Sequence, residues 1–309
     1  MLLRQLEYLV ALARERHFAR AAAACYVSQP SLSAGIRKLE HELDVPIVYR
    51  GSRFEGLTPE GERVLAWAHR ILAERDALQQ ELSEMRGGLS GTLRMGAIPT
   101  ALTAASLLTT PFCERHPQAR VSLDSLSSAE ITHRLAEFEL DVAMTYLDDD
   151  ALHHVRKIPL YEERYVLLTR EPIERTAGWA QAAALPLCLL SPRMRNRRII
   201  DEYFEAAGAT ANPSVESDTV AGLYAHLVAG QWSSVISHAW LHMFGVPEGM
   251  HVVPLKGPAH GPRVGLVVAD HEPRSVLAAA LLEVARETRV RDALDDLLNA
   301  HLGKRQIKP

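Results

Sequence analysis

Apolar side chains recur at helical spacing through the N-terminal part of the chain, which predicts three helices. The positions are Leu6, Leu9, Val10 and Ala13 in the first stretch, the alanine-dense run Phe18 to Ala24 in the second, and Leu32, Ile36 and Leu39 in the third. The small side chains of the second stretch permit close approach between helices. These residues therefore predict a small helical unit.

The third predicted helix begins at a polar cap and carries polar groups on its free face. Ser28 can cap its N-terminus, and Pro30 is tolerated in the first turn, where its missing N–H costs nothing. Short or polar side chains occupy the leading end and the opposite face: Gln29, Ser31, Ser33, Ala34, Arg37 and Lys38. With the short turn at 25–27, this order predicts a helix-turn-helix, whose second helix enters the major groove of DNA. A glutamine amide can pair with adenine there, while serine and arginine reach phosphate or guanine.

Two short runs, Pro46 to Tyr49 and Phe54 to Leu57, flank a polar turn and predict a small hairpin. The hairpin would be a wing beside the groove helix, with Arg50 and Arg53 as its basic residues. Arg53 at the tip is placed to enter a minor groove, whose narrowness concentrates negative potential. The alternative is a three-helix unit with an ordinary solvated face. The coincidence of turn, helix and wing favours DNA binding.

A long charged helix is predicted from Thr58 to Arg86, because Thr58 and Pro59 supply a cap and a first-turn proline. Apolar positions along it follow a heptad-like spacing that Arg75 alone interrupts: Val64, Ala68, Ile71, Leu78, Leu82 and Met85. The spacing favours a dimer seam, and the alternative is one amphipathic helix packed on its own domain. A two-fold dimer would read an inverted-repeat operator.

After Gly87 and Gly88 the pattern changes to short apolar strands alternating with helices, which predicts an α/β region with a parallel sheet. The predicted strands are 93–97, 121–126, 141–146, 165–168, 187–190, 214–216, 234–236 and 264–268, and the predicted helices are 104–115, 131–138, 196–207, 220–229 and a terminal group. The last strand and the terminal helices are expected to return to the first lobe. The predicted domains are a DNA-binding domain at 1–58, a linker helix at 59–88, lobe 1 at 89–162 plus 268–309, and lobe 2 at 163–267.

Polar side chains follow several of the predicted strands at their carboxyl ends, where ligands bind in open α/β sheets. They are Pro99 and Thr100, Ser127 and Ser128, Arg193 and Arg195, and Thr219. Hydroxyl groups and arginines that converge there would bind a small organic anion, with Arg193 or Arg195 as a bidentate clamp. The alternative for each residue alone is a helix cap or a solvated surface side chain.

Charge, hydropathy and cysteine content limit how the protein can bind DNA, where it is expected to reside and which sites it can hold. The net charge of −4 gives no general attraction to phosphate. DNA binding must therefore rest on a local patch and on the pairing of two DNA-binding domains in a dimer. No run of apolar residues is long enough to span a membrane, and Arg4 and Glu7 interrupt the N-terminus, so a cytoplasmic protein is expected. The three cysteines lie far apart with no metal-ligand spacing, so neither a zinc site nor a disulfide framework is indicated.

An enzyme is the first alternative function, since two α/β lobes can host chemistry. The sequence has no phosphate-binding glycine loop, no nucleophile elbow and no metal-ligand spacing of histidines and carboxylates, so neither catalysis nor a cofactor is expected. The adjacent His153 and His154 point in different directions on a helix or a strand, which argues against a shared ligand. A solute-binding module without a regulatory role is the second alternative, but it has no need of a groove helix and a dimer seam.

Four motifs resemble those of LysR-type transcriptional regulators. They are 18–22 (Phe-Ala-Arg-Ala-Ala), 27–33 (Val-Ser-Gln-Pro-Ser-Leu-Ser), 36–40 (Ile-Arg-Lys-Leu-Glu) and 57–61 (Leu-Thr-Pro-Glu-Gly). The resemblance is strong over residues 1–65 and looser beyond. It implies that Gln29, Pro30, Ser33 and Ala34 lie in the major groove and that Arg53 lies on the wing. Ala34 departs from the polar or basic residue common in the family, Asp44 replaces a common glycine, and Glu55 puts an acid on the wing.

The resemblance also implies two lobes similar to periplasmic binding proteins, with the effector held between them and Thr100 and Ser128 at positions that the family uses. The segment 230–234 departs from the family's glycine-rich strand entry. The resulting hypothesis is a regulator of transcription, a homodimer or homotetramer, which binds an inverted-repeat operator in double-stranded DNA. RNA polymerase is a further partner that this implies. Effector binding would change the arrangement of lobes or subunits and so the spacing of the DNA-binding heads.

Overall fold

The chain divides into two units, Met1–Gly87 with Ala136–Glu139, and Gly88–Leu135 with Leu140–Pro309. The computed structural model describes residues 1–49, 54–86, 88–153, 155–173, 175–257, 261–269 and 275–303. Among these residues no helix combines the length and the apolar character needed to cross a membrane. The same residues contain no group of three side chains suited to hold a metal ion.

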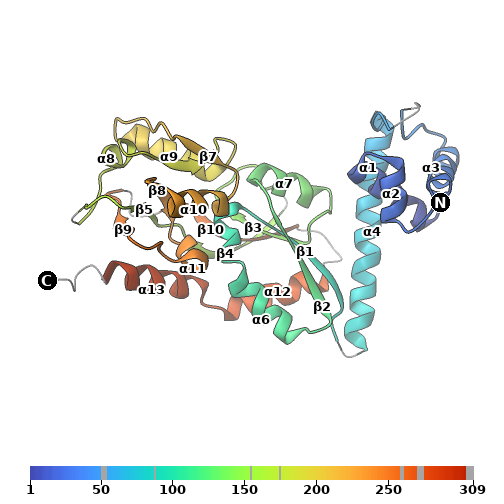
Figure 1. Ribbon diagram of the computed structural model, residues 1–309. Coiled ribbons are helices and arrows are strands. Elements are labelled where there is room, and N and C mark those ends of the chain that lie inside the picture. Colours follow the sequence, from blue (N-terminus) through green and yellow to red (C-terminus); the bar gives the residue numbers. More distant parts are fainter. Residues whose placement is uncertain are drawn as a thin grey trace. The chain divides into compact units, whose positions relative to one another are not determined.

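The first unit is helical, as the spacing predicts. It contains α1 (Leu3–Glu15), α2 (Phe18–Ala24), α3 (Gln29–Leu43) and the long α4 (Pro59–Met85). The helices α1 to α3 pack together against the N-terminal part of α4 (Figure 1). The three predicted apolar positions of α3, Leu32, Ile36 and Leu39, are at most 1% exposed. The apolar stripe thus forms the core of this unit.

The expected wing is present in its described part. Val48 and Leu57 form an antiparallel bridge, and the Tyr49 amide donates to the Gly56 carbonyl at 3.2 Å. Arg50 and Arg53, predicted to contact DNA from the turn of the wing, lie outside the described residues.

The described residues of the second unit form three sheets. The strands are β1 (Gly91–Ala97), β2 (Ala119–Ser125), β3 (Val142–Tyr146), β4 (Val155–Glu162), β5 (Tyr165–Thr169), β6 (Cys188–Leu190), β7 (Val215–Ser217), β8 (Ser234–Ser237), β9 (His251–Pro254) and β10 (Arg263–Ala269). The five-stranded sheet has the order β2-β1-β3-β10-β4, the three-stranded sheet has the order β8-β5-β9, and β6 and β7 form a two-stranded sheet. We call the five-stranded sheet and its helices lobe 1, and the other two sheets and their helices lobe 2.

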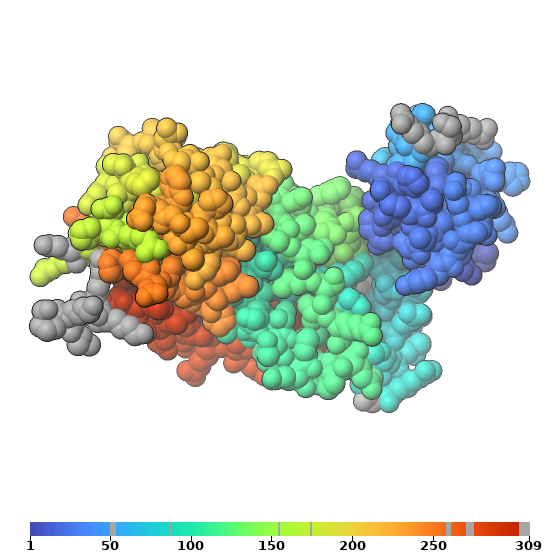
Figure 2. Space-filling model, in the orientation of Figure 1, coloured from blue at the N-terminus to red at the C-terminus, as the bar shows by residue number. Residues whose placement is uncertain are grey.

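Helices cover these sheets. They are α5 (Pro99–Leu102), α6 (Ser106–Arg115), α7 (Ser128–Ala136), α8 (Trp179–Ala183), α9 (Arg195–Ala206), α10 (Val220–Ala229), α11 (Trp240–Phe244), α12 (Val276–Glu287) and α13 (Val290–Gly303). The terminal helix α12 packs on α6 and β1 of lobe 1, as expected, whereas α13 contacts β4, β9 and α11 and so touches both lobes. In the surface view of Figure 2, green residues of lobe 1 meet yellow and orange residues of lobe 2 without a break.

The prediction of a parallel sheet is wrong in part. β1 pairs in parallel with β2 and β3, but β10 runs antiparallel to β3 and β4, and β5 runs antiparallel to β8 and β9. The sequence pattern missed β4 and β9 because neither alternates cleanly or is uniformly apolar. β4 carries charged Arg156 and Lys157 together with Pro159. The two missed strands are the ones that lead from lobe to lobe.

The chain passes from lobe to lobe between β4 and β5 and again between β9 and β10; we call these stretches the crossing segments. Their described residues meet at Glu163, whose amide donates to the Pro262 carbonyl at 2.9 Å. β10 belongs to the sheet of lobe 1 from Arg263 onward. The expected boundary at 267/268 therefore falls inside a strand, and the second crossing ends about at Pro262.

Candidate functional site

The predicted groove helix α3 exposes the face that the sequence assigns to DNA. Ser28 caps it, because its Oγ accepts from the Ser31 amide at 3.3 Å. Six of the predicted contact residues are exposed and Ser33 is half-buried; the exposed six are Gln29, Pro30, Ser31, Ala34, Arg37 and Lys38. The structure thus brings these side chains together on one accessible surface.

The position of α3 depends on close contact with α1. A Cβ at Gly35 would lie 2.6 Å from Cδ2 of Tyr8, so that only glycine fits there without a shift of the ring. Gly35 carries no signal in the hydrophobic pattern, and sequence reasoning missed it. Its role is to let α1 support the groove helix from behind.

The wing is attached to the end of α3 by a carboxylate. Oε1 of Glu40 accepts from the amides of Ile47 at 2.8 Å and Val48 at 3.2 Å. Thr58 holds the other side, since its hydroxyl donates to the Pro46 carbonyl at 2.6 Å while its Oγ1 accepts from the Gly61 amide at 2.9 Å. One carboxylate and one hydroxyl therefore fix the base of the wing relative to α3 and α4.

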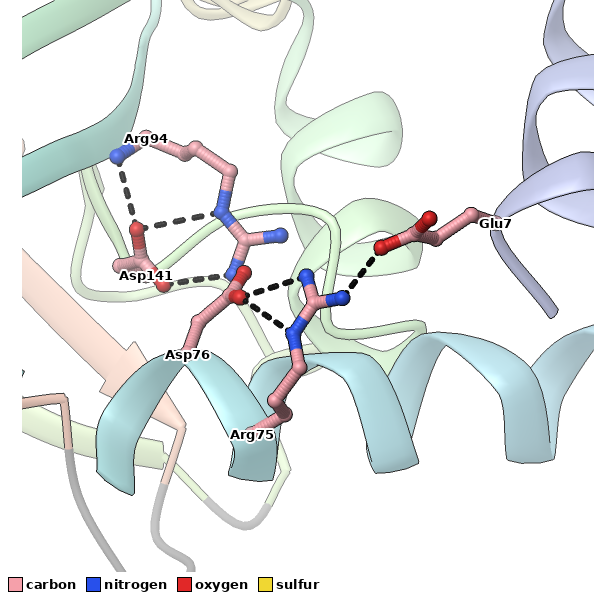
Figure 3. Close-up of polar contacts among 5 residues, drawn as sticks. All are labelled: Glu7, Arg75, Asp76, Arg94 and Asp141. Carbon is pink, nitrogen blue, oxygen red and sulfur yellow. Dashed lines mark hydrogen bonds and ion pairs between the residues drawn. The ribbon is translucent and has the colours of Figure 1, made fainter. Parts of the chain in front are cut away.

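Arg75, the residue that interrupts the apolar spacing of α4, connects α4 to α1. Its guanidinium donates to Oδ1 of Asp76 at 2.8 Å and to Oε1 of Glu7 on α1 (Figure 3). Figure 3 also shows the pair of Arg94 and Asp141 in the second unit, where Nη2 of Arg94 lies 2.7 Å from Oδ1 of Asp141 and ties β1 to the start of β3. Both arginines hold neighbouring elements in place.

The apolar seam predicted on α4 divides into two parts. Ala68 is fully buried, and Val64 and Ile71 pack against the core of the first unit. The later positions are open: Leu78, Leu82 and Met85 are 55%, 44% and 79% exposed. Of the predicted seam positions, those in the N-terminal part of the helix thus pack on their own domain, and those in the C-terminal part present an apolar surface.

In the second unit, Thr100 and Ser128 lie at the buried ends of β1 and β2, as predicted. Pro99 and Thr100 begin α5, and Oγ1 of Thr100 lies 3.4 Å from the hydroxyl of Tyr146. Ser128 is 7% exposed, and its hydroxyl has no hydrogen-bond partner among the described residues. These two side chains are the predicted effector contacts that are buried and polar at the ends of neighbouring strands.

Two other predicted contacts act as helix caps. The hydroxyl of Ser127 donates to Oε2 of Glu130 at 2.7 Å, and the Glu130 carboxylate also accepts from the Ser127 amide. These hydrogen bonds lower the pKa of the Glu130 carboxyl. Oγ1 of Thr219 accepts from the Gly222 amide at 3.1 Å at the start of α10. A helix cap, the alternative to an effector contact, therefore accounts for both Ser127 and Thr219.

The two predicted anion-binding arginines are already paired with acids. Arg193 forms an ion pair with Asp218, and its side chain is 74% exposed. Nη1 of Arg195 lies 2.6 Å from Oδ2 of Asp149, and its Nη2 donates to the Asp148 carbonyl at 3.0 Å. The guanidinium carbon of Arg195 also lies 5.7 Å from the ring centroid of Tyr146, the tyrosine beside Thr100. The bidentate clamp stays a prediction.

Sequence reasoning missed the most buried acid of this unit, Glu163, which lies in the first crossing segment. It is 1% exposed. Its Oε2 accepts from the hydroxyls of Tyr146 at 3.0 Å and Tyr165 at 2.6 Å, and the Asn196 amide lies 3.5 Å away. Burial raises the pKa of the Glu163 carboxyl in spite of these hydrogen bonds. Tyr146 belongs to lobe 1 and Asn196 to lobe 2, so this cluster joins the lobes.

Comparison with known proteins identifies both units. Residues 3–62 match the family described as bacterial regulatory helix-turn-helix protein, lysR family, and residues 86–289 match the LysR substrate binding domain. A hydrogen peroxide-inducible genes activator from Haemophilus influenzae is 28% identical over 88% of this chain and 92% of its own length. The Escherichia coli regulator OxyR is 33% identical over 62% of this chain and 61% of its own.

Solved structures have the same fold. A full-length OxyR variant from Pseudomonas aeruginosa superposes with a TM-score of 0.74 at 26% identity, covering 94% of this chain and 97% of that one. Full-length CbnR in complex with its target DNA superposes with a TM-score of 0.67 at 22% identity, covering 93% of this chain and all of that one.

Proposed function

The chain belongs to the LysR family of bacterial DNA-binding regulators, and we propose that it binds an inverted-repeat operator as a dimer or tetramer under the control of a small-molecule effector. Its effector-binding domain is the second unit. α3 of each protomer would enter a major groove, and the wing would contact the backbone beside it. The exposed polar face of α3 is the single observation that carries this proposal.

In this proposal the affinity for operator DNA comes from a few side chains on α3 and from the pairing of two DNA-binding domains in a dimer. Basic and acidic residues nearly balance over residues 1–66, so one head has little general attraction to phosphate. Gln29 would pair with a base edge, Arg37 and Lys38 would contact phosphate, and Ala34 would touch a thymine methyl. Two heads held by one dimer would bind two half-sites at once, which multiplies weak individual contacts.

The exposed apolar part of α4 supports the dimer. Leu78, Leu82 and Met85 follow one another at helical spacing and lie well exposed. Burial of such a stripe against its copy would stabilise a helix pair by about 25 cal/mol per Å² removed from water. Because the upstream seam positions pack within the domain, we place the seam in the last three turns of α4.

The effector would bind in the second unit between the lobes. Thr100 and the unpartnered hydroxyl of Ser128 follow the ends of the neighbouring strands β1 and β2, and the crossing segments beside Glu163 would form the hinge between the lobes. A ligand that binds one lobe arrangement more tightly than another shifts the population toward it. An anionic effector, as predicted from Arg193 and Arg195, would have to compete for these side chains with Asp218 and Asp149, which pair with them.

Several relatives are named for induction by hydrogen peroxide. Peroxide sensing by a thiol requires an accessible thiolate. Burial raises the pKa of the Cys188 thiol to about 11, and this residue is fully buried, while Cys113 is exposed on α6. We propose reversible binding of an organic effector and expect peroxide to leave the DNA footprint unchanged.

A footprint of the full-length protein on the DNA upstream of its own gene tests the DNA-binding proposal. Gln29→Ala should weaken binding roughly 10-fold or more, since a bidentate base contact is worth about 1–3 kcal/mol. Gln181→Ala, an exposed glutamine on α8, is the matched control and should bind like the wild type. Normal binding by Gln29→Ala would defeat the assignment of α3 to the groove.

A further inference from the structure

One aromatic side chain, Tyr26, projects into solvent from the turn between α2 and α3. It is 96% exposed, more than any other large apolar side chain among the described residues, and Met85 comes next at 79%. The neighbours of Tyr26 in the turn, Cys25 and Val27, are partly buried and pack against the core of the first unit. The turn therefore directs the two flanking side chains inward and Tyr26 outward.

The backbone at Tyr26 has a conformation that favours glycine. Its φ is 55°, in the left-handed region, where a bulky side chain is strained. Three backbone hydrogen bonds hold this end of α2, from the amides of Cys25, Tyr26 and Val27 to the carbonyls of Ala21, Ala23 and Ala22, at 3.0, 3.1 and 3.0 Å. Glycine is the usual residue at such a helix end. Tyrosine at this position therefore makes the first unit less stable than glycine would.

Tyr26 lies close to the end of α3 that is assigned to the groove. It precedes Gln29, the first residue of α3, by three residues. Three residues of chain span at most about 11 Å, and a major groove is about 12 Å wide. With the N-terminal end of α3 in the groove, the residues just before it lie within reach of the phosphates at the groove's edge. Ser28, Gln29 and Pro30 are exposed too, so Tyr26 extends the accessible surface at the start of α3.

We propose that Tyr26 is a further DNA contact, whose hydroxyl donates to a phosphate beside the major groove while its ring packs on the sugar. This inference rests on the proposed function, because it requires the N-terminal end of α3 to lie in the groove. Tyrosine side chains are regular donors to DNA phosphates, and such contacts fix a protein on the duplex without reading its sequence. Binding also gives a reason for the strain, since residues in sparsely populated backbone conformations gather at functional sites. The hydrogen-bonded turn holds the backbone of Tyr26 in place before DNA binds, which limits the entropy lost on binding.

Gel-shift titration of the full-length protein tests the contact, on the DNA upstream of its own gene and on a duplex of scrambled sequence. Tyr26→Phe removes the hydroxyl and should weaken binding to both duplexes by the same factor, several-fold or more. The slope of log affinity against log salt should stay that of the wild type, because an uncharged hydroxyl releases no counterion. Gln29→Ala, at the expected base contact, should instead weaken binding to the upstream DNA more than to the scrambled duplex.

Tyr26→Gly separates binding from folding. It removes the ring together with the strain, so it should weaken binding to both duplexes roughly tenfold or more while the first unit melts no lower than in the wild type. Asp44→Gly is the matched control, because Asp44 is exposed, has a φ of 53° and follows α3 at its other end. That end lies about 22 Å from Gln29 along the helix. Asp44→Gly should melt no lower than the wild type and bind DNA at least as tightly.

The proposal is overturned if Tyr26→Phe binds both duplexes like the wild type, if it loses affinity for the upstream DNA alone, or if Tyr26→Gly melts below the wild type. Both Tyr26 variants should also keep the wild-type mass in gel filtration with light scattering. A lower mass would assign Tyr26 to a contact between copies of the chain and so defeat the DNA contact.

Gln29→Ala distinguishes this inference from the proposed function on which it rests. If Gln29→Ala weakens binding to the upstream DNA and the Tyr26 variants do not, the proposed function stands and the Tyr26 contact alone fails. If all of these variants bind like the wild type, the assignment of α3 to the groove fails as well.

Discussion

The hydroxyl of Tyr146 donates to Oε2 of Glu163 at 3.0 Å. Tyr146 ends the central strand β3 of lobe 1, and Glu163 lies in the segment that crosses to lobe 2, so this hydrogen bond joins the strand to that segment. Both groups are almost fully buried, and burial is the main reason why the pKa of the Tyr146 phenol lies well above its ordinary value. The tyrosine therefore stays protonated and acts as a donor.

Tyr146→Phe should destabilise the second unit by about 1–3 kcal/mol, because a buried acceptor loses a donor without gaining water. Calorimetric melting of the full-length protein measures the effect as a lower temperature of the transition of that unit. Tyr26→Phe, at a tyrosine that is 96% exposed in the first unit, is the control and should melt like the wild type. Equal melting of the two variants would contradict a structural role for this hydrogen bond.

His238 makes stability depend on pH. Burial lowers the pKa of its imidazole from 6.5 to about 4, and its Nδ1 accepts from the Arg164 amide at 3.1 Å. The folded state thus binds fewer protons than the unfolded state between these values, so the contribution of His238 is complete above pH 6.5 and is lost as the pH falls toward 4. The loss is on the order of 3 kcal/mol.

His238→Asn should abolish that part of the pH dependence, since an amide oxygen can replace Nδ1 and does not titrate. Melting temperatures at pH 7.5 and pH 5 should differ less in this variant than in the wild type. His242→Asn, at an exposed position of α11, should keep the wild-type difference. A wild-type difference in His238→Asn would assign the acid sensitivity to other groups.

Glu40→Ala should weaken DNA binding without removing a DNA contact. It deprives the amides of Ile47 and Val48 of their common acceptor and so releases the wing from the end of α3. The expected cost in stability of the first unit is about 1–3 kcal/mol, with a several-fold loss of operator affinity in a gel-shift titration. Glu84→Ala, at an exposed acid near the end of α4, should change neither quantity. Wild-type affinity in Glu40→Ala would show that the wing does not need this anchor.

Leu82→Lys should dissociate the dimer, because a charge would be placed within the apolar part of α4 that we assign to the seam. Light scattering during gel filtration should show a lower mass at micromolar concentration than for the wild type. Glu81→Lys, a charge change at the neighbouring exposed position, is the control and should keep the wild-type mass. An unchanged mass of Leu82→Lys would place the interface elsewhere.

Local sequence patterns were sufficient to predict the helices of the first unit. The apolar positions of α3, its serine cap and the cap and proline of α4 are set by neighbours within a few residues, and all of them are present as predicted. In the second unit the predicted strands of lobe 1 and the return of the C-terminal strand were confirmed. The direction of that strand was wrong, because parallel and antiparallel pairing depend on how distant segments meet.

The sequence by itself determined which helix carries the polar face that we assign to DNA and where the long helix begins, since helix periodicity and capping are interactions over three or four residues. Only the tertiary structure decided which apolar positions of α4 stay exposed, the pairing of Arg193 and Arg195 with acids, and the burial of Glu163. Glu163 follows an unrecognised strand and looks like any surface acid in the sequence. Its burial beside Tyr146 and Tyr165 arises from contacts between segments far apart in the chain. That burial raises the pKa of its carboxyl, as no neighbour in the sequence would.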